Sequence, residues 1–173
     1  MTDISIEKIG FDLVTEKERI VFKEIVLKSY MQYESFFSEE KWSNYLKELE
    51  GVTTHAGTDY FIIAKLNEKT VATLQVYQNG EAAYDERAPK IDYPVIRFLA
   101  VDPEARGKGI AKQLLDHAIV YGKSLRSKKI LLHTMEMMPD AARLYERYGF
   151  NRNEQYDYYK DGLIIKSYTF DLN

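Results

Sequence analysis

The strongest constraint on the fold is a strand, turn, helix and strand pattern between residues 94 and 135. The runs PVIRFLAV (94–101) and KILLHTM (129–135) are rich in apolar residues and predict two strands. A glycine-containing turn and an amphipathic helix ending near Lys123 separate them. Two parallel strands joined through a helix form a crossover that is right-handed in nearly all proteins. We therefore expect a mixed sheet with a parallel strand pair and with helices packed on it.

The flanking segments predict further helices and antiparallel strands, and so a mixed α/β fold. Thr15 and Glu18 form a capping box at the start of a helix over 15–30. Asp161-Gly162 is a strong signal for the turn of a hairpin. The other predicted elements are a helix over 38–51, hairpin strands over 60–66 and 71–78, a polar loop over 79–93, a short helix over 140–149, and hairpin strands over 154–160 and 163–170. We expect them to form a single domain over residues 1–173.

Composition narrows the class of protein. The chain has 173 residues, of which 45% are hydrophobic, enough for one sizeable core. Its 24 basic and 27 acidic residues give a net charge of −3, which disfavours a general nucleic-acid binder. The absence of cysteine excludes disulfides, a thiolate nucleophile and a Cys-ligated zinc ion. The first residues lack the pattern of a secretory signal, and no apolar run is long enough to span a membrane, so we expect a cytoplasmic protein.

The turn that opens the helix of the crossover is a candidate anion site. Gly107 and Gly109 let a ligand approach the backbone closely, and Arg106 and Lys108 add positive charge. Free N–H groups and the dipole at a helix start also favour an anion. The chain has no P-loop, and Lys112 stands where a dinucleotide fingerprint needs its third glycine. The alternative is an ordinary basic turn in which glycines only make the turn tight.

Two segments with matching spacing carry a resemblance to a known family. The first is R-x-x-G-x-A at Arg106, Gly109 and Ala111, and the second is A-x-x-L-Y-E-x-x-G-F from Ala141 to Phe150. In this order, with a helix between them, they resemble the GNAT superfamily of N-acetyltransferases, which use acyl-CoA. The specific resemblance runs from about residue 98 to residue 150.

The resemblance implies a fold and a cofactor site. The strands 94–101 and 129–135 would splay apart, in a mostly antiparallel sheet, and acyl-CoA would lie between them. The backbone of Leu99, Ala100 and Val101 would pair with the pantetheine arm. The amides of the turn would hold the pyrophosphate; they belong to Arg106, Gly107, Lys108, Gly109, Ile110 and Ala111. Many family members carry an asparagine where this chain has Met138, so we expect no polar contact from that side chain.

The resemblance also assigns a general acid. Tyr145 matches the tyrosine that protonates the departing CoA thiolate, and a phenol with a pKa of about 10 keeps its proton at neutral pH. The alternative role for Tyr145 is core packing, because Leu144 and Tyr148 share its side of the helix.

The sequence contains two candidates for the general base and does not decide between them. His133 lies on the strand 129–135, where some family members place a catalytic glutamate, and Glu136 follows at the end of that strand. The alternative for His133 is a hydrogen-bonded histidine of the core, without a catalytic role. The alternative for Glu136 is a solvated carboxylate in a loop. Nothing in the sequence supports a metal site.

The expected function is acetyl transfer from acetyl-CoA to a primary amine of a small molecule or peptide, directly in a ternary complex. The acidic residues of the 79–93 loop would suit a cationic amine, although Arg87 and Lys90 offset part of their charge. The alternative function is a non-catalytic acyl-CoA-binding or regulatory module. We expect no nucleic-acid or membrane partner, and a monomer or a homodimer.

Overall fold

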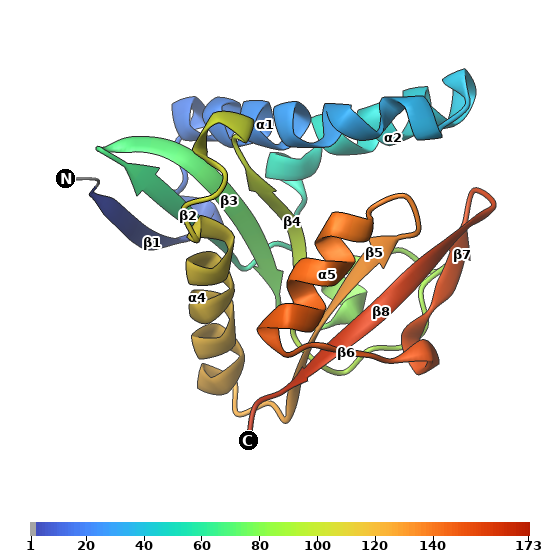
Figure 1. Ribbon diagram of the computed structural model, residues 1–173. Coiled ribbons are helices and arrows are strands. Elements are labelled where there is room, and N and C mark those ends of the chain that lie inside the picture. Colours follow the sequence, from blue (N-terminus) through green and yellow to red (C-terminus); the bar gives the residue numbers. More distant parts are fainter. Residues whose placement is uncertain (1–2) are drawn as a thin grey trace. The chain divides into compact units, whose positions relative to one another are not determined.

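The crossover predicted between residues 94 and 135 is present in the computed structural model, which describes residues 3–173 (Figure 1). Strand β4 (Val95–Val101) pairs in parallel with β5 (Lys129–Met135), and helix α4 (Ile110–Ser124) connects them. The register joins Val95 to Leu131 and Ile96 to Leu132.

Most of the sheet consists of antiparallel strand pairs. The hydrogen-bonded order is β1-β2-β3-β4-β5-β8-β6, and β7 also pairs with β8. The pairs β1–β2, β5–β8, β6–β8 and β7–β8 are antiparallel, which confirms the mixed, mostly antiparallel fold class. The remaining elements are β1 (Ile4–Gly10), α1 (Glu16–Tyr30), α2 (Glu39–Glu50), β2 (Tyr60–Leu66), β3 (Lys69–Tyr77), α3 (Gly80–Ala83), α5 (Pro139–Tyr148), β6 (Asn151–Arg152), β7 (Tyr158–Lys160) and β8 (Leu163–Asp171).

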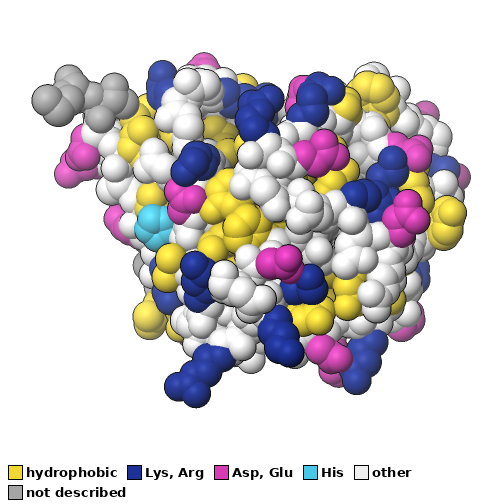
Figure 2. Space-filling view, turned by 60° about the horizontal axis from the view of Figure 1, so that its bottom comes forward, with side chains coloured by type: hydrophobic (Ala, Val, Ile, Leu, Met, Phe, Trp, Pro, Cys, Tyr) yellow, Lys and Arg dark blue, Asp and Glu magenta, His cyan; other side chains and the backbone are white. Residues whose placement is uncertain are grey.

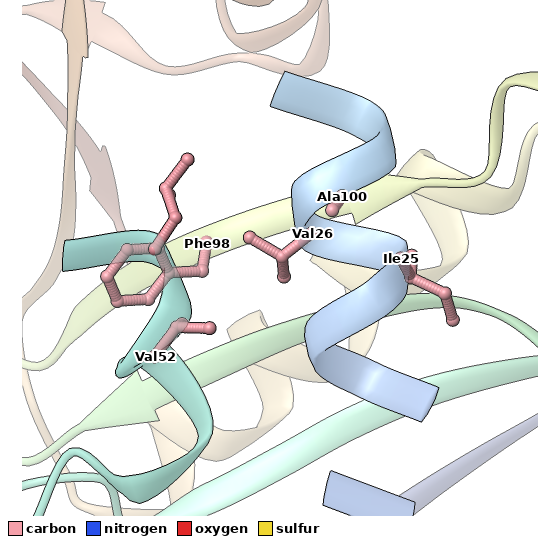
Figure 3. Packing of buried hydrophobic residues seen from close by; sticks show 6 residues of the cluster. Ile25, Val26, Val52, Phe98 and Ala100 are labelled. Atoms are coloured by element: carbon pink, nitrogen blue, oxygen red, sulfur yellow. The ribbon is translucent and has the colours of Figure 1, made fainter. Parts of the chain in front are cut away.

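The described chain divides into two compact units, and the first joins the N-terminal elements to the segment Phe98–His117. It holds the described residues up to Gln75, with helices α1 and α2 in contact. Its core brings together side chains from α1, α2, the 3-10 turn Val52–Thr54 and β4, as Figure 3 shows for five of them. The members are Ile25, Val26, Leu49, Val52, Phe98 and Ala100.

The second unit consists of Val76–Arg97 and Ala118–Asn173. Its centre is the pairing of β5 with β8 over seven residues, from Lys129–Asp171 to Met135–Ile165, and α5 contacts β5. The cluster under the segment after β3 consists of Tyr77, Ala83, Ile91, Val95 and Leu131.

Local signals in the sequence place most element ends correctly. The Thr15 hydroxyl accepts a hydrogen bond from the Glu18 N–H, and the Glu18 carboxylate accepts one from the Thr15 N–H, so the capping box is confirmed. Asp161 and Gly162 both have positive φ, as the predicted hairpin turn requires.

Two predictions for irregular segments were wrong. The loop 79–93 contains the one-turn helix α3, in which the Ala82 N–H donates to the Asn79 side chain, and four residues are too few to show a helical period. The first half of the predicted strand 154–160 is a 3-10 turn over Glu154–Tyr156, because the Asn153 side chain accepts a hydrogen bond from the Gln155 N–H. Only Tyr158–Lys160 remains as strand β7, and β6 was not expected.

Phe98 has an unusual backbone within β4. Its φ is +57°, a left-handed conformation that costs a non-glycine residue about 1–2 kcal/mol. The ring is 9% exposed and lies beside Val52 and Val26 in the core of the first unit (Figure 3). Burial of a phenylalanine side chain contributes about 2–3 kcal/mol, which offsets this backbone cost.

Candidate active site

The turn between β4 and α4 has the backbone shape of an anion site. After β4 the chain makes a 3-10 turn over Pro103–Ala105 and then exposes Arg106–Gly109 before α4 begins. Gly107 and Gly109 have φ angles of +78° and +74°, which residues with a Cβ rarely adopt. A Cβ built on either glycine would meet no atom of the described chain within 4 Å, so both glycines face open space.

Donors and positive charge gather at this turn. The first N–H groups of α4, from Ile110 onward, have no acceptor within the helix, and the helix dipole is positive at this end. The side chains of Arg106 and Lys108 are exposed and add two positive charges. Phosphate oxygens take backbone N–H groups and cations as partners. Residues 106–111 therefore fit the pyrophosphate of an acyl-CoA.

Asp102 holds the start of the turn in place. Its side chain is buried, and its N–H donates to the Val71 carbonyl at 2.7 Å. The carboxylate accepts hydrogen bonds from the Glu104 N–H at 3.0 Å and from Lys28 Nζ at 3.3 Å. These contacts, chiefly the one from Glu104, lower the pKa of Asp102.

A second contact ties the turn to the end of α1. Nη2 of Arg106 donates to Oγ of Ser29 at 3.2 Å, and Ser29 is buried. Lys28 and Ser29 thus attach the turn to the last turn of α1, from positions 74 and 77 residues away in sequence. Neither residue could be predicted from the sequence, because nothing local marks a contact over that distance.

The strand before the turn presents the backbone expected to meet the pantetheine arm. Ala100 is buried in the first unit, whereas Leu99 and Val101 are partly exposed. The Tyr30 hydroxyl, at the end of α1, donates to the Leu99 carbonyl at 3.4 Å. Tyr30 was not among the predicted site residues.

Tyr145 lies on α5 in the second unit. It is 8% exposed, and its ring packs near Phe150 and Tyr168, with ring centroids 6.0 and 6.4 Å away. It also interacts with Tyr84. Burial raises the pKa of Tyr84 well above 10.0, Arg97 opposes that rise, and Tyr145 is among the phenols that add to it.

His133, on β5, has hydrogen-bond partners at both ring nitrogens. Nδ1 lies 2.8 Å from the Tyr84 hydroxyl, and Nε2 lies 2.8 Å from the Tyr156 carbonyl oxygen. Burial lowers the pKa of His133 to about 4, although the Tyr156 carbonyl pulls it the other way. The imidazole is therefore neutral at pH 7. Neither Tyr84 nor Tyr156 was predicted as a partner, because they lie 49 and 23 residues from His133 in sequence.

Glu136 follows β5 and is exposed. Its carboxylate forms an ion pair with Lys166 on β8 at 3.6 Å. A carboxylate has about four acceptor sites, so this ion pair leaves most of them available.

Charges of both signs are mixed on the surface. In Figure 2, Lys and Arg side chains are interspersed with Asp and Glu side chains on the face that is drawn. Within residues 3–173, no cluster of three or more His, Asp or Glu side chains is arranged to hold a metal ion. None of the helices in that range is long and apolar enough to cross a membrane.

Comparison with known proteins agrees with the geometry. The sequence model of the acetyltransferase (GNAT) family matches residues 23–150. An uncharacterized N-acetyltransferase of Methanocaldococcus jannaschii is 27% identical over 143 residues, 82% of this chain and 60% of that protein. The PaiA N-acetyltransferase of Thermoplasma acidophilum, solved in complex with coenzyme A, has the same fold with a TM-score of 0.70 and 16% identity, over 97% of this chain and 99% of that one. A GNAT acetyltransferase of Elizabethkingia anophelis, solved with acetyl-CoA bound, gives a TM-score of 0.59 and 18% identity over 97% of both chains.

The chain belongs to the GNAT family of acetyltransferases. The family match includes both the turn at 106–111 and the α5 segment with Tyr145. The matched part of the chain spans between 19% and 60% of the length of the curated relatives, which are longer proteins.

Proposed function

We propose that this protein transfers an acetyl group from acetyl-CoA to a primary amine of a small molecule or peptide, directly in a ternary complex. The observation that carries the proposal is the turn at 106–111, with its two left-handed glycines facing open space at the start of α4. An acyltransferase of this family needs such a site for the pyrophosphate of its cosubstrate.

The residues that would hold the cosubstrate come from β4 and the turn. The N–H groups of residues 106–111 and the side chains of Arg106 and Lys108 bind the pyrophosphate, and the backbone of Leu99–Val101 pairs with the pantetheine arm. Acetyl-CoA, when bound, supplies an activated thioester carbonyl. The contacts of Asp102 with Lys28 and of Arg106 with Ser29 keep the turn in its binding shape before the ligand arrives.

Tyr145 donates the proton that the leaving sulfur needs. The amine nitrogen attacks the thioester carbonyl, the C–S bond breaks, and the Tyr145 hydroxyl protonates the departing thiolate. A buried phenol suits this step because it stays protonated at neutral pH.

The amine must lose a proton before it attacks. An alkylammonium with a pKa near 10.4 is only about 0.04% neutral at pH 7. Of the two candidate bases, Glu136 is exposed and has a single ion-pair partner, Lys166, whereas both nitrogens of His133 already have partners. We assign proton removal to Glu136, directly or through one water molecule.

A panel of amines, amino acids and peptides, scored by release of the CoA thiol, tests the proposal. We expect at least one acceptor to give turnover. Tyr145→Phe should then lower kcat by about 100-fold or more, the usual contribution of a general acid, with little change in the KM of acetyl-CoA. The matched control is Tyr159→Phe, because Tyr159 is 73% exposed. Unchanged turnover in Tyr145→Phe would exclude the acid role.

The same panel separates the enzyme from a non-catalytic module. Tight binding of CoA together with no turnover on any acceptor would favour an acyl-CoA-binding or regulatory protein. Glu136→Gln tests the base, since it should lower kcat at pH 7 and lower it less at high pH, where more of the acceptor amine is already neutral.

A further inference from the structure

His133 is a largely enclosed titratable group of the second unit, and its surroundings fix which proton it carries. A carbonyl oxygen can only accept a hydrogen bond, so Nε2 of His133 must carry the hydrogen that points to Tyr156. In the neutral ring Nδ1 is then an acceptor, and it must receive the hydroxyl proton of Tyr84. The chain from Tyr84 through His133 to Tyr156 therefore runs in one direction only.

This direction determines what Tyr84 can offer to a ligand. Its single hydroxyl proton is committed to His133, so the rest of the oxygen presents lone pairs. A group that donates an N–H can bind there, whereas a group that only accepts cannot. The acceptor of the proposed reaction is an amine, which is such a donor.

The rings around His133 hold the pair in place. Tyr84 and Tyr158 meet the imidazole edge to face, with centroids 5.0 and 5.2 Å away at 85° and 79°. The guanidinium of Arg97, on β4, lies 4.7 Å from the centroid of the Tyr84 ring, and its Nη1 donates to the Ala83 carbonyl at 2.5 Å. Segments from α3, β4, β5 and β7 thus meet at one histidine.

The charged groups that act on His133 do not favour its protonation. Arg97 and Arg152 disfavour a positive imidazole, and only Asp157 favours it. Asp157 is itself paired with Arg152, through two contacts of 2.5 and 2.7 Å. With a pKa near 4, His133 would take a proton from an alkylammonium at an equilibrium disadvantage of about a million-fold.

We propose that His133 is a positioning residue that, as the neutral Nε2–H tautomer, turns the Tyr84 hydroxyl so that its lone pairs bind the N–H of the acceptor amine. The proposal rests on the proposed acetyl transfer and deepens it, because it names Tyr84 as a specificity-determining residue for the acceptor. Tyr84 is partly exposed, and its partner His133 lies on β5, the strand that α5 contacts; α5 carries Tyr145, the proposed acid.

Three variants test the proposal against a base and against a purely structural residue. Tyr84→Phe should raise the KM of the amine about 3- to 10-fold, the effect of losing one hydrogen bond, without changing the KM of acetyl-CoA. His133→Leu removes both hydrogen bonds, so it should also raise the KM of the amine without changing the KM of acetyl-CoA. His133→Gln, whose amide can donate to Tyr156 and accept from Tyr84, should restore the amine KM and keep the pH profile of kcat. His117→Gln is the matched control, since His117 is an exposed histidine on α4.

Two results would overturn the proposal. One is a loss of about 100-fold or more in kcat for His133→Gln, together with loss of a limb of the pH profile, which would make His133 the base. The other is equal KM values for the amine in wild type, Tyr84→Phe and His133→Leu, which would leave His133 a packing residue.

Nitrogen-15 NMR of the wild-type protein tests the tautomer without any substrate. We expect a proton on Nε2 and none on Nδ1 from pH 8 down to about pH 5. A proton on Nδ1 would refute the geometry. If no amine is acetylated by the wild type while the NMR result holds, the proposed function fails and the hydrogen-bond direction stands. If the wild type is active and Nδ1 is protonated, the further inference alone fails.

Discussion

Lowering the pH from 7 to 4.5 should destabilise the protein through His133. Its pKa is about 4 in the folded protein and 6.5 in an unfolded chain, because burial penalises the charged ring. Between these values the unfolded state binds more protons, so the free energy of unfolding falls as the pH falls. The full difference is about 3 kcal/mol, of which about 2.5 kcal/mol is lost by pH 4.5. At pH 7 and above none of this stability is lost.

Urea unfolding at pH 7, 6, 5 and 4.5 measures the effect when wild type is compared with His133→Gln. The glutamine does not titrate, so the difference between the two curves isolates the histidine. Carboxylates that do not act on His133, such as Asp102, whose pKa the Glu104 N–H lowers, contribute equally to both proteins and cancel. His117→Gln should keep the wild-type dependence, because His133 is still present. Parallel curves for wild type and His133→Gln would refute the reasoning, since they would mean that His133 is not held neutral.

Three further substitutions test the turn, its support by Asp102, and the packing of α4 against Leu172. Gly109→Ala should cost about 1 kcal/mol of stability, because φ is +74°, and should weaken CoA binding measured by calorimetry. The control is Gly51→Ala, at a φ of −90°, which should leave CoA binding unchanged. Asp102→Ala removes the N–H acceptor and the Lys28 partner, so we expect a loss of about 1–3 kcal/mol in thermal unfolding and weaker CoA binding; wild-type affinity would contradict the anchoring role. Gly122→Ala would place a Cβ 2.8 Å from a Leu172 methyl carbon. We expect the free energy of unfolding to fall by about 1 kcal/mol, although alanine has the better helix propensity. A gain in stability would show that the Leu172 side chain moves aside freely.

Local chemistry explains why much of the fold could be predicted. The capping box at Thr15, the Ser38 cap of α2 and the Asp161-Gly162 turn act over three or four residues, and each lies where the sequence indicated. The same holds for the glycines of the anion turn, since their left-handed backbone is a property of the residues themselves.

Contacts over long sequence distances account for what could not be predicted. The hydrogen bond from Arg106 to Ser29 and the pair Tyr84–His133 depend on how remote segments meet, and no period or spacing marks them. His133 illustrates the consequence. As a residue type it suggested a base, and only its two partners reveal that both nitrogens are engaged. The left-handed backbone of Phe98 within β4 could not be predicted either, because an apolar strand pattern does not indicate the φ angle of a single residue.

The position of β8 has a consequence for synthesis of the protein. It is the last strand in sequence, yet in the sheet it lies between β5 and the short strands β6 and β7. A ribosome therefore exposes β5 well before its partner emerges, and Ile130, Leu131 and Leu132 then belong to an open sheet edge. Chains that stall or end before residue 163 should be prone to aggregation through that edge, and the second unit can complete its folding only after residues 163–171 have left the ribosome.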